Sequence, residues 1–211
     1  MKIEVWSDLV CPWCFIGKRR MEKALAQYEH ADNVQVIWRS YQLDPNQLRG
    51  ENIPTSEMLS HKHGVTPGQA KTMNDRVSAL AAEEGLAYQL DKAVTANTFD
   101  ALRLTHLAGA HNLTDAMYER LLRAALMEGE AIDDTDTLVR LATEAGLPAE
   151  VARKALDDGA FADEVDDDIR QARDLGVGGV PFYVIDRTYG ISGAQSVETI
   201  LAALRKAATP L

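Results

Sequence analysis

The chain has 211 residues, 46% of them hydrophobic, and its 32 acidic side chains outnumber the 22 basic ones to give a formal net charge of −10. This length is enough for a substantial core, in one large domain or two smaller ones. The charge argues against a nucleic-acid-binding protein, because such proteins need a basic face to meet phosphate.

The N-terminal part of the chain predicts a strand, a helix and a second strand. Residues 2–7 alternate between apolar and polar and are rich in β-formers. Residues 17–29 have the apolar spacing of a helix, and Pro12 stands where a helix would begin, because a proline is tolerated in the first turn. Residues 33–43 read as the second strand.

The middle of the chain, residues 54–175, is dominated by helical periodicity. Candidate caps for its helices are Thr66 (with Gln69 three positions later), Thr114 and Thr135. No stretch approaches the ~18 uninterrupted apolar residues of a membrane-spanning helix, so no membrane partner is expected.

Strand character returns near the C-terminus. Residues 180–186 are apolar enough for a buried strand, and residues 188–193 would pair with it as a hairpin around Asp186 and Arg187. Ser196 would then cap a closing helix. The two ends of the chain are therefore expected to form one mixed sheet of four strands or slightly more.

This order of elements predicts an α/β fold with an insertion. Residues 1–52 and 160–211 would form a discontinuous domain, and residues 53–159 an inserted all-helical domain.

The stretch "WSDLVCPWCFIG" holds the only two cysteines, Cys11 and Cys14. They could be a metal clip, a structural disulfide or a thiol–disulfide reaction centre. The charged N-terminus does not resemble a signal peptide, so we expect a cytoplasmic protein, and that compartment does not favour a lone structural disulfide. A zinc site needs four ligands, and no histidine has a spacing that completes one, so no metal is expected.

The reaction-centre interpretation fits the position of the pair. Cys11 follows the first strand at the start of the first helix, where unpaired N–H groups and the helix dipole stabilise a thiolate. Cys14 lies three residues later on the same face, close enough for a disulfide. We therefore expect Cys11 to be exposed and nucleophilic, and Cys14 to be less exposed and to resolve the mixed disulfide.

Pro181, in "GGVPF", is the second candidate part of the site. By itself it could simply begin an edge strand. Together with the cysteine pair and the strand order, it predicts a cis Val180–Pro181 peptide facing Cys11. The backbone of Val180 would then be available to an extended substrate segment.

Four blocks carry a family resemblance: "SDLVCPWCFIGKRR", "ANTFDALRLTHLA", "LGVGGVPFYVID" and "YGISGAQS". On these blocks the chain resembles the thioredoxin superfamily, specifically its DsbA-like branch with a helical insertion. Closer still, it is similar to the FrnE-like cytosolic dithiol–disulfide oxidoreductases, which are relatives of 2-hydroxychromene-2-carboxylate isomerases and kappa-class glutathione transferases. The resemblance implies a thioredoxin-like fold.

The resemblance also implies residue roles. Asn97 would begin the helix whose first turn approaches the active site. The redox motif and the cis-proline turn would comprise Cys11, Pro12, Trp13, Cys14, Val180 and Pro181.

One departure concerns proton transfer. Val5 stands where thioredoxins and DsbA carry a buried acid, six residues before Cys11. Asp8 is the nearest alternative for moving a proton to or from Cys14. Its place in a turn is also typical of a solvated or helix-capping acid.

The leading functional hypothesis is a thiol–disulfide oxidoreductase or isomerase that acts on disulfide- or thiol-containing proteins or small molecules. It needs no resident cofactor, although glutathione could serve as thiol co-substrate. One alternative is a glutathione-dependent isomerase or transferase acting on an aromatic small molecule, although those relatives generally have serine in place of the first cysteine. The other is a non-catalytic peptide-binding module.

Overall fold

The structure, a computed structural model, describes residues 1–208. It separates into two compact units, one of Met1–Leu43 with Asp167–Leu211 and one of Asp44–Asp166. The second boundary falls within helix α8 (Ala162–Asp174). The sequence places the domain boundaries after residues 52 and 159 instead. Those boundaries stay a prediction.

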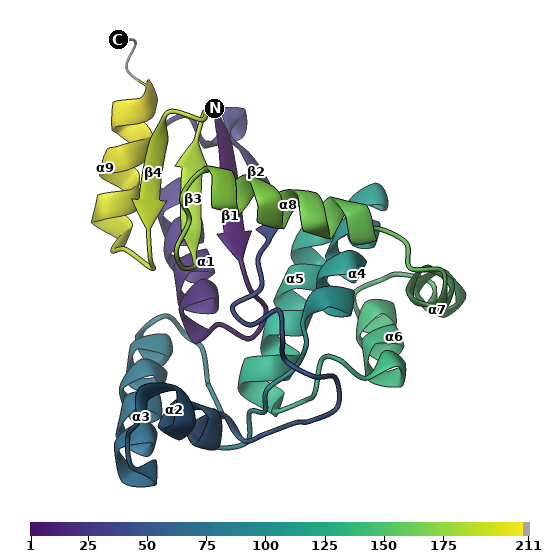
Figure 1. Ribbon diagram of the computed structural model, residues 1–211. Helices are drawn as coiled ribbons and strands as arrows, with labels where there is room; N and C mark the ends of the chain where they lie inside the picture. The colour runs from purple at the N-terminus through teal and green to yellow at the C-terminus, as the bar shows by residue number, and fades with distance from the viewer. Residues whose placement is uncertain (209–211) are drawn as a thin grey trace. The chain divides into compact units, whose positions relative to one another are not determined.

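The first unit is built on a four-stranded mixed sheet of order β2-β1-β3-β4 (Figure 1). Strand β1 pairs in parallel with β2 and antiparallel with β3, and β3 pairs antiparallel with β4. This confirms the predicted four-stranded mixed sheet from the two ends of the chain. The elements are β1 (Lys2–Ser7), α1 (Pro12–Leu25), η1 (Ala31–Asn33), β2 (Gln35–Ser40), β3 (Phe182–Ile185), β4 (Tyr189–Ser192) and α9 (Val197–Ala208).

Helices cover both faces of this sheet because alternate side chains of β1 and β3 point to opposite sides. On one face, Val5 and Tyr183 are cross-strand neighbours in a core that includes Met21 of α1 and Leu204 of α9. On the other face, Trp6 packs with Ala172 of α8. Figure 1 shows α8 passing in front of the strands.

A buried ionic network holds the α8 side of the sheet. Glu4 is only 1% exposed, and it accepts hydrogen bonds from Arg39 of β2 (2.6 Å) and from Arg187 of the β3–β4 turn (2.7 Å). Arg39 also pairs with Asp168 of α8 at 2.9 Å. Burial of Glu4 opposes ionisation, but the arginine hydrogen bonds and charges outweigh it and lower the pKa of Glu4 below its ordinary value of 4.5.

The β3–β4 hairpin forms as predicted. Asp186 and Arg187 both have positive φ, 47° and 56°, and the Thr188 amide donates to the Ile185 carbonyl at 2.9 Å. Two consecutive left-handed residues match the twist of a hairpin, here without the glycine that usually allows them.

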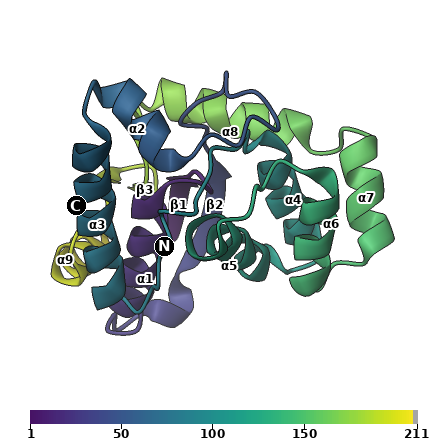
Figure 2. The same ribbon diagram turned by 90° about the horizontal axis from the view of Figure 1, so that it is seen from below.

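The second unit is helical. Its described residues contribute no strand to the sheet and form an isolated β-bridge, Pro54 with Val94. Helix α2 packs beside α3, and α6 beside α7 (Figure 2). The elements wholly inside the unit are α2 (Thr55–His63), α3 (Pro67–Glu83), α4 (Phe99–Ala110), α5 (Thr114–Arg123), the π-helical turn η2 (Ala124–Glu128), α6 (Thr135–Glu144) and α7 (Ala149–Asp157).

Two of the predicted helix caps are confirmed and two are wrong. Thr66 and Gln69 form a capping box at the start of α3, and the Ser196 hydroxyl accepts from the Thr199 amide at 3.2 Å. Thr114 and Thr135 are instead the first helical residues of α5 and α6. Along residues 1–208, no helix has both the length and the apolarity needed to cross a membrane.

Candidate active site

The two cysteines lie at the N-terminus of α1. Cys11 is the N-cap residue, with extended backbone angles (φ −86°, ψ 114°), and Pro12 occupies the first turn as predicted. The helix begins at Pro12 and ends at Leu25, so it starts earlier and stops sooner than the sequence pattern of residues 17–29 indicated. Cys14 is therefore inside the helix, and its amide donates to the Cys11 carbonyl at 3.0 Å. Both cysteines are free thiols.

The Cys11 sulfur faces the loop that precedes β3. The Val180–Pro181 peptide is cis, which confirms the prediction. The Cys11 thiol is directed at the Val180 carbonyl oxygen, with 3.6 Å between sulfur and oxygen. The availability of the Val180 backbone to an extended substrate stays a prediction. Contact between the sulfur and the proline ring stays a prediction.

The expected exposure of Cys11 is wrong. The residue is buried, with 4% of its surface exposed against 1% for Cys14. The physical reason is its cap position, which turns the thiol inward to the Val180 carbonyl. A reagent or substrate therefore has little direct access to this residue in the structure.

Cys14 is held as a neutral thiol. Burial raises the pKa of Cys14 well above its ordinary value, and its hydrogen bond to Cys11 and the negative charge there raise it further. The Ser7 side chain and the Asp8 backbone amide act in the opposite direction and lower this pKa. The surroundings of the Cys14 sulfur therefore oppose its ionisation.

The Asp8 side chain is neither solvated nor a helix cap. Its exposed fraction is 1%, its Oδ2 accepts from the Leu43 amide at 2.7 Å, and α1 has no side-chain cap. It holds the segment that follows β2 against the turn before Cys11. A role for its carboxylate in proton transfer stays a prediction.

Trp13 has 39% of its surface exposed, in contrast to the buried cysteines on either side of it. An exposed aromatic ring beside the pair fits a substrate-contacting surface, and this role also stays a prediction. Among residues 1–208, no cluster of three or more histidine, cysteine or acidic side chains could hold a metal ion.

Residues 2–205 match the family model of the DSBA-like thioredoxin domain. The chain belongs to this family. The thioredoxin-like fold expected from the sequence is therefore confirmed.

Solved structures agree with this family assignment. A probable DsbA oxidoreductase from Streptomyces coelicolor is 44% identical with a TM-score of 0.96, covering 100% of this chain and 92% of that one. The cytosolic disulfide reductase DsbM from Pseudomonas aeruginosa is 20% identical (TM-score 0.65; 98% of each chain). A 2-hydroxychromene-2-carboxylate isomerase is 15% identical (TM-score 0.70; 98% and 95%). The last two are similar in fold alone.

Asn97 lies just before α4 in the second unit of this DSBA-like chain. Its Oδ1 accepts from the Phe99 amide at 3.1 Å, and its Nδ2 donates to the Gln47 carbonyl at 2.8 Å. It therefore stabilises the start of the helix from outside it, because α4 begins at Phe99 and Thr98 is its N-cap, whereas the resemblance had implied a helix that begins at Asn97. Its approach to the cysteine pair stays a prediction.

Three residues around the cysteines were missed by sequence reasoning. Ser7 continues the inward face of Ile3 and Val5, so strand alternation could have placed it beside α1. Gly17 is a glycine inside a helix, which is unfavourable and therefore a signal of close packing. No local signal distinguishes Tyr183 from an ordinary core residue of β3.

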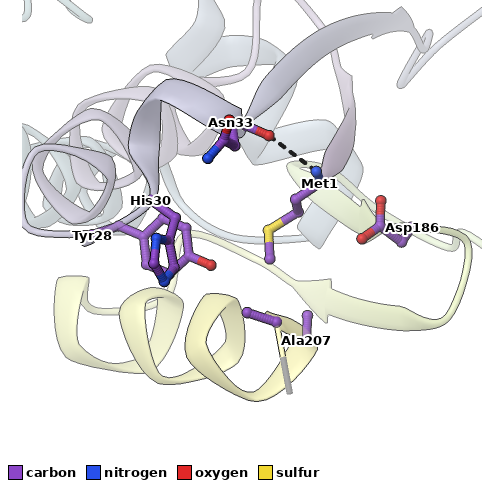
Figure 3. A pocket seen from close by; sticks show the side chains of 7 residues that line it. Met1, Tyr28, His30, Asn33, Asp186 and Ala207 are labelled. Carbon is purple, nitrogen blue, oxygen red and sulfur yellow. Dashed lines mark hydrogen bonds between the residues drawn. The ribbon is translucent and has the colours of Figure 1, made fainter. Parts of the chain in front are cut away.

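A separate cavity of about 350 Å³ lies at the other end of β1, where Met1 precedes the strand (Figure 3). Tyr28, His30 and Asp186 contribute to its lining, and the Met1 amino group donates to the Asn33 carbonyl at 3.0 Å. None of the residues predicted to act in the redox site lines this cavity.

Proposed function

We propose that this DSBA-like protein is a thiol–disulfide oxidoreductase that works through Cys11 and Cys14. The observation that carries the proposal is the inequality of the two sulfurs. Cys11 caps the N-terminus of α1, where the amide groups of the first turn favour a thiolate, while Cys14 is buried and its pKa is raised.

In the reducing direction, the Cys11 thiolate attacks one sulfur of a substrate disulfide. A bond forms between Cys11 and that sulfur, the substrate S–S bond breaks, and the other substrate sulfur leaves as a thiolate. Cys14 then loses its proton to this thiolate or to solvent and attacks Cys11. The mixed disulfide breaks, the second substrate thiolate leaves, and the protein carries a Cys11–Cys14 disulfide. The reverse sequence oxidises a dithiol.

The substrate class in this proposal is a disulfide- or thiol-containing protein or small molecule. Glutathione is a candidate thiol co-substrate, and the cytoplasm is the proposed location. The location is supported by the fold shared with a cytosolic disulfide reductase, and the co-substrate by a solved structure of that reductase with glutathione. The fold is also shared with an isomerase, but the pair of free thiols favours redox chemistry over a glutathione-dependent isomerisation or transfer. The net direction depends on the reduction potential of the pair.

Reduction of insulin by dithiothreitol or glutathione tests the proposal. The wild-type protein should accelerate it, and Cys11→Ser should abolish the acceleration. A Cys14→Ser variant should accumulate a mixed disulfide on Cys11. If wild type and Cys11→Ser are equally inactive while both bind an extended peptide, the peptide-binding alternative is favoured instead.

A further inference from the structure

The Tyr183 hydroxyl is a buried donor near the cysteine pair that finds no acceptor among the described residues. The residue is 2% exposed, and its oxygen makes no hydrogen bond. Buried polar groups are almost always paired, because an unpaired one loses its interaction with water and gains nothing in return. A phenylalanine would fill the same space without this cost, so the hydroxyl calls for a functional explanation.

The position of this hydroxyl is set by α1 and by the Pro181 loop. A Cβ atom built on Gly17 would collide with the Tyr183 oxygen and would lie 2.9 Å from Cγ of Pro181. The missing side chain of Gly17 therefore lets the tyrosine oxygen reach the surface of the active-site helix. Tyr183 follows Pro181 by two residues, so the loop and the hydroxyl approach α1 together.

Gly17 lies three positions after Cys14, which places both on one face of α1. The hydroxyl consequently lies beside the helical turn that carries the Cys14 sulfur. The electrostatics agree with this placement. Burial raises the pKa of Tyr183, and negative charge on Cys14 and on Cys11 raises it further, whereas Arg20 lowers it. The phenol therefore keeps its proton and can act only as a neutral partner of a thiolate.

We propose that the Tyr183 hydroxyl donates a hydrogen bond to the Cys14 sulfur when that sulfur becomes a thiolate in the resolving step. This inference rests on the proposed function. In that step the Cys14 proton leaves, the new thiolate attacks Cys11, and the substrate thiolate departs with the electron pair of the mixed disulfide. Tyr183 transfers no proton; it stabilises negative charge on a sulfur that has little access to water.

The matched variants are Tyr183→Phe, which removes only the hydroxyl, and Tyr189→Phe on the neighbouring strand. Tyr189 packs in the same core, and its ring faces Lys206 at 5.5 Å. The first measurement uses the Cys11→Ser background, where Cys14 is the sole cysteine, and follows the rate of iodoacetamide labelling against pH. Tyr183→Phe should shift the pH dependence of the Cys14 labelling rate to higher pH, and Tyr189→Phe should leave it unchanged.

The second measurement keeps both cysteines and follows the lifetime of the mixed disulfide after reaction with glutathione disulfide. The mixed disulfide of Cys11 with glutathione should persist about tenfold longer in Tyr183→Phe, as expected for the loss of one hydrogen bond to a charged sulfur, and should be unaffected in Tyr189→Phe. Circular dichroism checks that both variants are folded.

An unchanged labelling profile of Cys14 in Tyr183→Phe overturns the role of the hydroxyl. A wild-type protein that never forms a mixed disulfide overturns the proposed function instead. In that case the labelling profile still decides whether the tyrosine stabilises the Cys14 thiolate, because it requires no turnover.

Discussion

At the scale of single residues, the chemistry of the site depends on how differently the protein treats two sulfurs that are three positions apart. Cys11 and Cys14 are both buried, so exposure does not distinguish them as the sequence suggested. The distinction is electrostatic: Cys14 lies in a helix interior without solvent, and its pKa is raised by burial and by Cys11. Cys11 lies at the end of the helix, where the dipole favours negative charge.

Brief alkylation measures this difference. In the reduced protein at neutral pH, iodoacetamide should label Cys11 at least about tenfold faster than Cys14, because only the thiolate reacts. Mass spectrometry of the peptide that contains both cysteines gives the ratio, and Cys11→Ser and Cys14→Ser identify each product. Equal labelling, or faster labelling of Cys14, would contradict the assignment of the nucleophile.

At the scale of secondary-structure elements, the distance between α1 and the Pro181 loop is set by Gly17. Replacing it with alanine should gain roughly 0.5–1 kcal/mol of helix propensity but lose more, because the new methyl group meets Pro181 and Tyr183. We expect a net loss of about 1–2 kcal/mol in the free energy of unfolding, measured by urea denaturation. Adding Tyr183→Phe to Gly17→Ala should recover part of the lost free energy of unfolding, because it removes the oxygen that the methyl group meets.

Gly68 provides the control for this prediction. It lies in the first turn of α3, and a Cβ atom built there has no neighbour within 4 Å. Gly68→Ala should be neutral or stabilising by up to about 1 kcal/mol. If Gly17→Ala behaved in the same way, the close packing of α1 against the loop would not matter for stability.

The ionic network on the opposite side of the sheet predicts how stability depends on pH. The lowered pKa of Glu4 means that its contribution is fully present above its unfolded value of 4.5 and is lost as the pH falls through the folded value. At neutral pH, Glu4→Gln should cost about 2 kcal/mol in the free energy of unfolding. The difference in the free energy of unfolding between Glu4→Gln and wild type should shrink at about pH 3.

Glu29→Gln is the matched control, because Glu29 pairs with Arg205 on the surface, where both side chains are about half exposed. Solvent screens such a pair, so this variant should change the free energy of unfolding much less than Glu4→Gln. A Glu4→Gln penalty that is the same at neutral and acidic pH would contradict the ionised, arginine-bound state of Glu4.

The features that the sequence predicts depend on neighbouring residues, whereas most of those that it misses depend on residues far apart in the chain. The helix start at Pro12 and the Thr66–Gln69 capping box depend on neighbouring residues, so local patterns reveal them. Even local patterns fail where two acceptors compete: Asp134, not Thr135, caps α6 by accepting from the Thr137 amide.

Features that depend on distant contacts were not predictable in the same way. The Cys11 thiol contacts the Val180 carbonyl, 169 positions away, and the Glu4 network joins residues separated by up to 183 positions. The Tyr183 hydroxyl lies beside α1 only because β3 pairs with β1, which local sequence patterns do not show. The cis Val180–Pro181 peptide was predicted only when Pro181 was considered together with the cysteine pair and the strand order, and the family resemblance implied the same turn.

At the scale of the whole molecule, the candidate site is assembled from the two ends of the chain. Antiparallel pairing of β1 with β3 brings the start of α1 to the Val180–Pro181 loop, while the chain between β2 and β3 is occupied by the helical unit. Both parts of the site around the sulfurs therefore belong to the first compact unit.

The central claim, that Cys11 and Cys14 form a reversible dithiol–disulfide couple, is tested most directly by a redox titration. The protein is equilibrated in glutathione or dithiothreitol buffers of graded potential, quenched with acid and alkylated, and the fraction of Cys11–Cys14 disulfide is measured by mass spectrometry. A reversible couple should give one two-electron transition, with the oxidised-to-reduced ratio changing tenfold for every ~30 mV. Absence of the intramolecular disulfide at every potential, or its formation without reversal on reduction, would contradict it.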